Sequence, residues 1–339
     1  MMRYKTFEQF IFEKENSEYL KKVNFLLAGE KIEGLTGKNN KRIYGKINDK
    51  CLDNLFNAFY AEGDHGKSLN VDSNLPLIYY GGNKPEGFDF IKKYGYKEKD
   101  MYNVPSQMKH SGNKTDFYKM FNGADFIPKA VYKKEDTKNL EFPVIAKPDG
   151  EHSGIGIEIF DTYEELMKSQ SKFDNFSEAK DLEKEFRVLL LKDQNVLIHE
   201  RVSMSDNEIK DKDAEEQTSF VYVDQNMEKL DFLKELEVIN KEIREKIDLG
   251  LWSIDVMIDT SGKLWVAEIN AASGMAADKM ARVYIALYED YYKEQLPQEF
   301  KDYLTEEYIN PIHKINWKEN RVAIEKSKCA IDYKLISGK

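Results

Sequence analysis

Several residue types and patterns are scarce in this sequence, and each scarcity excludes a class of protein. The 339 residues contain two cysteines, Cys51 and Cys329, which lie far apart in the chain. A disulfide framework is therefore excluded, and a reducing cytoplasm is the expected location. No apolar run approaches the roughly 18 residues that a membrane helix needs. Met1–Phe10 has no apolar core of the secretory-signal type. We expect a cytoplasmic protein that does not bind membranes.

Histidine and arginine are also rare. The five histidines do not cluster, and no Ser/His/Asp or Cys/His arrangement indicates a hydrolase. Arginine supplies seven of the 51 cations: Arg3, Arg42, Arg187, Arg201, Arg244, Arg282 and Arg321. One explanation is a genome whose codon usage favours lysine, and under that bias arginine is favoured where a fixed fork of donors is needed.

The charge balance is acidic. Subtracting 61 Asp and Glu from 51 Lys and Arg leaves a formal net charge of −10, which argues against general nucleic-acid binding. The chain length and a hydrophobic fraction of 41% allow two or three packed units with a sizeable core. The sequence leaves open whether the protein forms a homodimer.

Strand and helix patterns alternate along much of the chain. Residues 1–30 have an interrupted amphipathic pattern and are expected to be helical. Leu75–Tyr80 is a short apolar run that indicates a buried strand, and Pro85–Tyr94 resembles a helix. From about residue 111 the pattern predicts helices at 114–121, 162–168, 230–247 and 276–294, and strands at 142–147, 155–160, 185–191, 196–202, 251–258 and 263–270.

The last two strands form a predicted hairpin that carries oxygen ligands. Asp255 lies on the first strand, and Glu268 and Asn270 lie on the second. Two or four loop residues put all three on one face, whereas three loop residues need a bulge to do so. Two carboxylates and an amide oxygen suit Mg²⁺ that also binds phosphates. The alternative interpretation is a solvated polar strand face.

A lysine followed by a glycine-rich turn is the second candidate site. Lys147 ends a strand, and the segment Pro148–Gly156 precedes another strand. Glycines let backbone N–H groups approach a phosphate, and the lysine supplies positive charge. The segment matches neither a Walker loop nor a dinucleotide fingerprint. A plain glycine-rich hairpin is the alternative.

Arg187 and Arg201 lie on two strands that form another expected hairpin. A three-residue loop would put them on one side of the sheet, and a four-residue loop on opposite sides. Two facing arginines require an anion between them, such as a phosphate or carboxylate. The alternative is ordinary ion pairing, for example between Arg187 and Glu200.

Taken in order, these motifs resemble the ATP-grasp superfamily over about residues 111–295. The stretch Glu268–Met275 is similar to that of its peptide-type ligases, which include D-alanine–D-alanine ligase, glutathione synthetase and the ligases that add glutamate to a ribosomal protein. Those ligases commonly have proline where this chain has Ser273. The resemblance implies an α+β fold in which two α+β subdomains hold ATP, preceded by a smaller N-terminal α/β domain. The expected domains are 1–110, 111–180 (small subdomain), 181–310 (large subdomain with the metal site) and 311–339 (an extension).

The resemblance also implies roles for individual residues. Metal ligands would be Asp255, Glu268 and Asn270, holding one or two Mg²⁺ ions, with Mn²⁺ as an alternative. Arg187 and Arg201 would neutralise the transferring phosphoryl group or fix a substrate carboxylate. ATP contacts would come from Lys114, Lys147, Glu151, His152, Ser153, Gly154, Gly156, Glu178 and Glu185. Glu178, in the expected hinge 175–179, is the candidate for the ribose. Substrate contacts would come from Ser273, Gly274, Lys279 and Arg282.

The implied reaction is ATP-dependent ligation of a carboxylate to an amine through an acyl phosphate. The substrate would be a small molecule or a peptide, and nucleic acid is not expected as a partner. Two alternatives stay open. One is an ATP-grasp kinase that phosphorylates a small molecule, and the other is a non-catalytic ATP-binding module.

Overall fold

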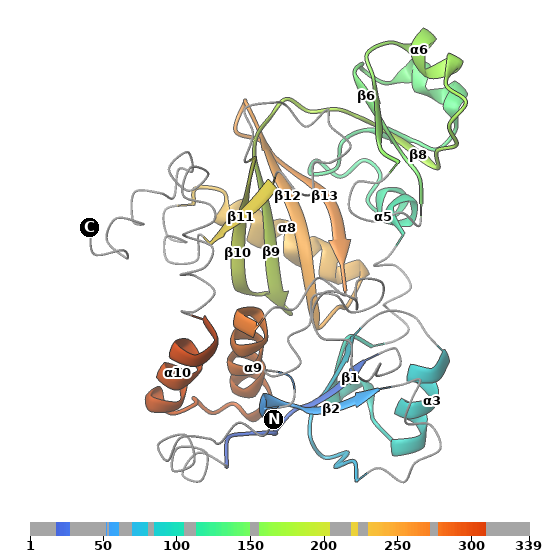
Figure 1. Ribbon diagram of the computed structural model, residues 1–339. Coiled ribbons are helices and arrows are strands. Elements are labelled where there is room, and N and C mark those ends of the chain that lie inside the picture. Colours follow the sequence, from blue (N-terminus) through green and yellow to red (C-terminus); the bar gives the residue numbers. More distant parts are fainter. Residues whose placement is uncertain are drawn as a thin grey trace, which may run out of the picture. The chain divides into compact units, whose positions relative to one another are not determined.

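The computed structural model describes residues 18–27, 52, 54–60, 70–80, 85–104, 113–149, 156–203, 218–222, 230–271 and 277–309 (Figure 1). Contacts divide the chain into two compact units. One combines the described residues up to 104 with 277–309, and the other contains 113–271. The expected domain limits at 110, 180 and 310 remain predictions. In the described parts of the chain, every helix is too short or too polar to span a bilayer.

A parallel sheet with the order β2-β1-β3-β4 forms the centre of the first unit. Its strands are β1 (Asn24–Leu27), β2 (Asn57–Tyr60), β3 (Leu77–Tyr80) and β4 (Met101–Tyr102). Helix α3 (Pro85–Tyr94) lies where it was expected, and η1 (Glu98–Asp100) precedes β4. The helix expected within residues 1–30 is wrong for 24–27. All four of those residues are buried, and such uninterrupted burial is typical of a parallel strand.

C-terminal helices complete the first unit. They are α9 (Ala277–Tyr292), α10 (Gln298–Leu304) and the π-helical η4 (Thr305–Ile309). Tyr284 of α9 is fully buried, donates a hydrogen bond to the carbonyl of Tyr19 and accepts one of 3.2 Å from the Lys22 N–H. Its ring packs edge-on against Phe56 at 5.1 Å. These contacts join α9 to the segments that flank the sheet.

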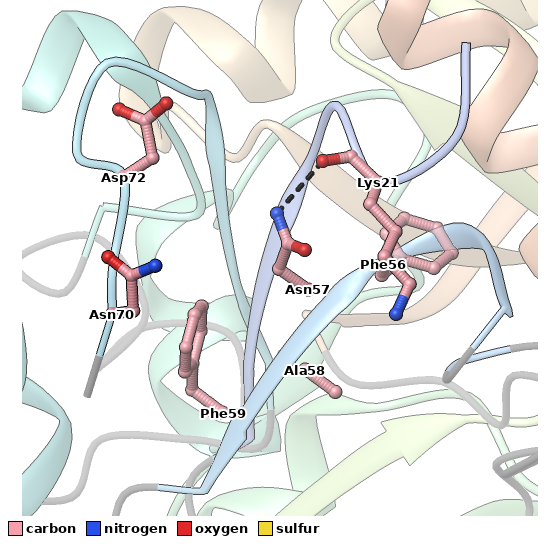
Figure 2. Close-up of a pocket in the computed structure, with 7 residues that line it drawn as sticks. All are labelled: Lys21, Phe56, Asn57, Ala58, Phe59, Asn70 and Asp72. Carbon is pink, nitrogen blue, oxygen red and sulfur yellow. Dashed lines mark hydrogen bonds between the residues drawn. The ribbon is translucent and has the colours of Figure 1, made fainter. Parts of the chain in front are cut away.

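A cavity of about 490 Å³ opens beside edge strand β2 of this unit (Figure 2). Asn57 donates a 2.8 Å hydrogen bond to the carbonyl of Lys21 at its rim. The cavity is lined by Lys21, Phe56, Asn57, Ala58, Phe59, Asn70 and Asp72. None of these residues belongs to the site expected from the sequence.

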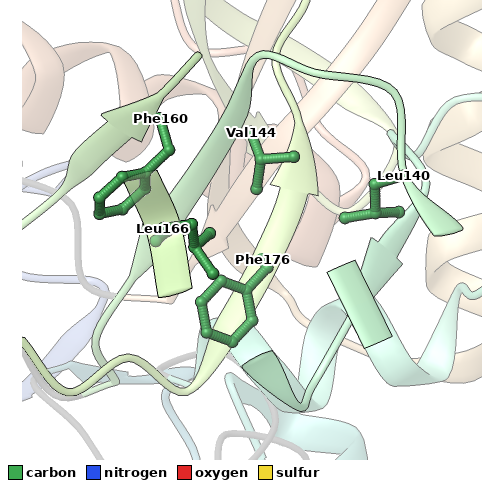
Figure 3. Packing of buried hydrophobic residues seen from close by; sticks show 6 residues of the cluster. Leu140, Val144, Phe160, Leu166 and Phe176 are labelled. Atoms are coloured by element: carbon green, nitrogen blue, oxygen red, sulfur yellow. The ribbon is translucent and has the colours of Figure 1, made fainter. Parts of the chain in front are cut away.

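The second unit begins with a small antiparallel sheet of the order β5-β8-β6-β7. Its strands are β5 (Ala130–Val131), β6 (Val144–Lys147), β7 (Glu158–Phe160) and β8 (Asn175–Glu178), accompanied by α5 (Lys114–Met120), η2 (Lys134–Asn139) and α6 (Tyr163–Lys168). Figure 3 shows its core, in which Val144 and Leu166 are fully buried beside Phe160 and Phe176. Thr162 caps α6 by accepting a hydrogen bond from the Glu165 N–H.

A larger antiparallel sheet of the order β11-β10-β9-β12-β13 follows. Its strands are β9 (Leu182–Leu191), β10 (Gln194–Ser203), β11 (Thr218–Tyr222), β12 (Leu251–Asp259) and β13 (Leu264–Asn270), and α8 (Leu233–Lys246) precedes β12. Phe232, next to α8, packs its ring on Phe186 of β9 at 4.8 Å. The β9–β10 turn has two residues, Lys192 and Asp193, and is shorter than expected.

Alternation gives this sheet two different faces. Phe186 and Val188 of β9 share the apolar face with Ile254 and Val256 of β12, and all four are buried. The opposite face carries Arg187 and Asp255 with their neighbours two residues away. The expected chemistry therefore lies on one face of a sheet whose other face is apolar core.

Candidate active site

The tip of the β12–β13 hairpin is fixed by Asp259. Its Oδ1 accepts hydrogen bonds from the backbone N–H groups of Ser261 (2.9 Å) and Lys263 (3.0 Å), and its Oδ2 accepts one from Trp265 Nε1 (2.8 Å). Hydrogen bonds from the side chains of Ser261 and Trp265 hold the pKa of Asp259 at about 2. The ionised carboxylate therefore stabilises the turn.

We expect Asp259→Asn to lower the thermal midpoint near neutral pH and to lose this effect in acid. The folded-state pKa is below the ordinary value of about 3.9. The stabilisation is therefore present above about pH 4 and is lost as the pH falls toward 2. Melting curves followed by circular dichroism between pH 7 and pH 2.5 measure the gap between wild type and variant. Asp125→Asn, at an exposed turn, is the control. A gap that keeps its size in acid would contradict the prediction.

The hairpin register brings the expected oxygen ligands together. Asp259 donates its N–H to the carbonyl of Lys263, so three residues form the loop. Val256 pairs with Val266, and a bulge at Ala267 then shifts the register, so that Asp255 lies opposite Glu268. This is the bulged alternative of the three loops considered from the sequence. The bulge brings both carboxylates to the same face.

Arg187 holds Asp255 in a two-point ion pair. The two residues lie directly opposite each other on β9 and β12. Arg187 Nε donates to Oδ1 of Asp255 at 2.6 Å, and a terminal guanidinium nitrogen donates to Oδ2 at 2.5 Å. The Asp255 side chain is 9% exposed and that of Arg187 is 26% exposed. Such a fork uses the planar donor geometry that only arginine offers.

Burial and pairing act in opposite directions on this ion pair. Burial raises the pKa of Asp255, while the hydrogen bonds from Arg187 lower it. Burial disfavours the charged form of Arg187, but the hydrogen bonds to Asp255 hold its pKa above the ordinary value. Because a guanidinium keeps its proton, the intact fork holds Asp255 ionised.

Glu268 is held by two further groups of the same unit. Asn270 Nδ2 donates to its Oε1 at 3.1 Å, and Lys114 Nζ lies 3.9 Å from its Oε2. Lys114 is the first residue of α5, which Asn113 caps by accepting the Asp116 N–H at 2.8 Å. The amide and the lysine expected to serve metal and phosphate thus lie beside Glu268.

Lys147 ends β6 with a nearly buried ammonium. Its Nζ donates to the Tyr118 hydroxyl at 3.3 Å and lies 5.1 Å from the centre of that ring. Lys147 is opposite Asn175 of β8, whose amide donates to the Thr115 hydroxyl. Thr115 also donates to Asp149 through its N–H and its hydroxyl. This network fixes α5 against the ends of β6 and β8.

The two other expected nucleotide contacts differ in their surroundings. Glu178 is buried at the end of β8, accepts the Glu141 N–H at 3.2 Å and pairs with Lys180 Nζ at 3.0 Å. Glu185 lies on β9, opposite Met257 of β12. Glu178 therefore already has protein partners on both carboxylate oxygens.

The remaining expected residues differ in how the structure places them. Glu151, His152, Ser153, Gly154, Ser273 and Gly274 lie outside the described residues. Arg201 pairs in backbone register with Glu185, two positions from the pair of His199 with Arg187, so the register puts positions 187 and 201 on the same side of the sheet. Gly156 is exposed, with φ +73°, a conformation that favours glycine. Lys279 and Arg282 lie on α9 of the other unit.

Sequence reasoning did not foresee three features: the partner of Arg187, the position of His199 and the burial of Ser253, whose place on this face does follow from alternation. In the described ion pairs, Glu200 pairs with Lys184 and Arg187 with Asp255, and the strand register puts Glu200 opposite Phe186, next to Arg187 in the strand. His199, buried on β10, lies opposite Arg187. Ser253 is fully buried opposite Asn270. Alternation from Asp255 signals Ser253, whereas His199 needs the register of a second hairpin.

Within the described residues, no three acidic, histidine or cysteine side chains converge as a metal cluster. The group here is instead two carboxylates and one amide on adjacent strands, with Arg187 and Lys114 beside them. Hard oxygen donors of this kind fit a divalent cation that shares its coordination with phosphates. The donor set therefore suits Mg²⁺ with a nucleotide better than an isolated structural metal.

Comparison with known proteins decides the family. The sequence model described as "D-ala D-ala ligase C-terminus" matches residues 107–286, just over half of the chain. The chain belongs to this family. It is an ATP-grasp protein with an α+β fold and an ATP-dependent ligase of the carbon–nitrogen bond-forming class, which confirms the resemblance seen in the sequence.

Solved structures of ATP-grasp ligases share the fold. D-alanine–D-alanine ligase from Bacillus anthracis is 12% identical with a TM-score of 0.53, and the match covers 88% of this chain and 99% of that one. The same ligase complexed with ATP is 12% identical with a TM-score of 0.50, and the match covers 88% of this chain and 98% of that one. N5-carboxyaminoimidazole ribonucleotide synthetase from Thermotoga maritima is 14% identical with a TM-score of 0.45, and the match covers 75% of this chain and 69% of that one. No curated protein sequence matches the chain. At identities this low, the two structures with TM-scores of 0.53 and 0.50 show a shared fold, and substrates are not transferred with it.

Proposed function

We propose that this ATP-grasp ligase joins a carboxylate to an amine through an acyl phosphate and releases ADP and phosphate. The observation that carries the proposal is the juxtaposition of Asp255, Glu268 and Asn270 on adjacent strands, with Arg187 and Lys114 in contact with the two carboxylates. A site with oxygen ligands and fixed cations on one face suits a polyphosphate.

The proposed reaction has two balanced steps. A carboxylate oxygen of the substrate bonds to the γ-phosphorus of ATP, and the bond from that phosphorus to ADP breaks. The amine nitrogen then attacks the acyl carbon, the bond from carbon to the phosphate oxygen breaks, and the amine loses a proton. Chemistry of this kind depends on positioning and charge neutralisation, so no protein nucleophile is required.

The chain's own residues would position the reactants and neutralise charge. Asp255, Glu268 and Asn270 would hold Mg²⁺, which supplies charge neutralisation at the phosphates when it is bound. Lys114 and Arg187 would hold phosphate oxygens, because their side chains already lie against the carboxylates of this group. Lys147, which donates to the Tyr118 hydroxyl of the helix that begins at Lys114, is the third candidate.

Other roles rest on the sequence resemblance. Arg201, Glu178, Glu185 and the segment 151–156 remain candidates for holding the nucleotide. Ser273, Gly274, Lys279 and Arg282 remain candidates for binding a small-molecule or peptide substrate. A cytoplasmic location likewise remains a prediction.

The test follows the fate of a carboxylate oxygen. Purified protein is incubated with ATP, Mg²⁺ and pairs drawn from amino acids and short peptides, one partner carrying ¹⁸O in its carboxylate. We expect ADP, inorganic phosphate containing ¹⁸O, and a product whose mass is the sum of the pair minus water. Asp255→Asn should remove all three signals.

Two outcomes would replace the proposal with its alternatives. A stable phosphorylated product without free phosphate would indicate a kinase. Tight ATP binding with no ADP formed across the whole panel would indicate a non-catalytic module.

A further inference from the structure

Both carboxylate oxygens of Asp255 are engaged by another side chain of the protein. Its two carboxylate oxygens each accept a hydrogen bond of 2.5–2.6 Å from the guanidinium of Arg187. The strands β9 and β12 place the two residues directly opposite each other, so the register of the sheet imposes the contact. A cation approaching Asp255 must therefore compete with a guanidinium that is already in place.

The second carboxylate of the group is engaged in a related way. Glu268 accepts the Asn270 amide on Oε1 and faces Lys114 on Oε2. The side-chain amide of Asn270 thus points its N–H donor toward Glu268, and the ammonium of Lys114 lies beside the same carboxylate. A divalent ion arriving here meets two positive charges within the same group, and both repel it.

A nucleotide triphosphate changes this balance. Its phosphate oxygens match the fork of Arg187 as well as a carboxylate does, and they carry more negative charge. The same phosphates attract Lys114. When these cations turn to the phosphates, Asp255 and Glu268 become available together.

Resting on the proposed function, we propose that the Arg187–Asp255 ion pair closes the metal position and that the phosphates of a nucleotide open it. Free divalent cations are excluded, and the cation binds only together with the nucleotide. When the nucleotide leaves, the sheet register restores the pair. Binding linkage then requires that metal and nucleotide raise each other's affinity by the same factor.

The experiment measures Mn²⁺ binding by the loss of the electron paramagnetic resonance signal of the free ion, at fixed protein concentration. It is done with and without the β,γ-imido analogue of ATP, so that no turnover is involved. We expect weak binding to the protein by itself and an affinity about a hundredfold higher with the analogue, near the upper range of such couplings.

Arg187→Met tests the role of the guanidinium, because it keeps the length of the side chain and removes the charge and the fork. We expect this variant to bind Mn²⁺ without nucleotide about tenfold more tightly than wild type, and its coupling to the analogue to shrink correspondingly. Arg187→Lys, which keeps the charge but loses the fork, should lie between the two.

Arg244→Met is the matched control. Arg244 belongs to the same unit and forms ion pairs with two carboxylates, those of Asp193 and Asp248. The described contacts include none between Arg244 and a residue of the proposed site. It should keep the wild-type coupling. Circular dichroism melts verify that each variant is folded, and Arg187→Lys carries the test if Arg187→Met does not fold.

The outcomes separate this inference from the proposed function. If the analogue binds but Mn²⁺ affinity is the same with and without it, the inference is wrong and the proposed function stands. An unchanged Mn²⁺ affinity in folded Arg187→Met would also overturn it. If the analogue does not bind to wild type at all, the proposed function fails.

Discussion

Glu268→Ala is expected to abolish ATP turnover, with kcat/KM falling about a thousandfold or more, which corresponds to about 4 kcal/mol of lost transition-state stabilisation. Glu268 stands between Asp255 across the strand pair, Asn270 on its own strand and Lys114 of α5. Removing its carboxylate would take away one proposed ligand of the divalent cation that would neutralise the phosphates. The measurement is the initial rate of ADP release at ATP concentrations well below KM, compared with wild type.

The fold should survive this substitution. The Glu268 side chain is 29% exposed, so its loss does not open a cavity in the core. Glu237→Ala, at an exposed position on α8, is the matched control and should keep full activity. Glu268→Gln adds a second readout, because it keeps the shape of the side chain while removing its charge. Near-wild-type turnover in either folded Glu268 variant would rule out this metal site.

Lys147→Met is expected to reduce kcat/KM for ATP about a hundredfold, within the range seen when one preorganised donor at a reacting group is removed. Lys147 is held by the Tyr118 hydroxyl and lies over the ring of Tyr118, so its ammonium is positioned before the nucleotide arrives. Methionine keeps the apolar length of the side chain and removes the charge. Steady-state kinetics and equilibrium binding of ATP measure the loss.

The chain provides a closely matched control for this lysine. Lys246 also lies over an aromatic ring, that of Phe121, at 4.6 Å, and also donates one hydrogen bond, to the carbonyl of Met120. Lys246 is exposed whereas Lys147 is buried, so Lys246→Met controls for the loss of a cation over a ring and should keep full activity. Melting curves of Lys147→Met measure the additional structural cost of changing a buried side chain. Equal losses of activity in the two variants would indicate a general structural effect and contradict a phosphate contact at Lys147.

Local pattern predicts much of this protein because its signals are strong over short distances. The hairpin of β12 and β13 could be located because apolar residues alternate on either side of a turn that contains Gly262. Helix α3 was predicted with the bounds that the structure has. The strand at 24–27 was missed because an unbroken buried run shows neither helical nor strand periodicity.

The pairing of Arg187 with Asp255 shows what a local pattern cannot provide. The partner of Arg187 depends on the order of strands in the sheet, and β12 rather than another strand lies next to β9. Nothing in the spacing of residues 187 and 255 indicates that adjacency. The bulge at Ala267 is a similar case, because whether a strand accommodates an extra residue depends on how the sheet closes around it.

The same strand order also bears on folding, because the sheet face that carries Arg187 and Asp255 forms only when β9 pairs with β12. Each hairpin, β9–β10 and β12–β13, closes over a short turn, whereas Arg187 and Asp255 are separated by 68 positions in the chain. Pairing across such a separation carries a larger entropic cost and is slower than local closure. We therefore expect the chain to form its hairpins before Arg187 meets Asp255, and an incompletely folded chain with both hairpins in place would still lack the proposed site.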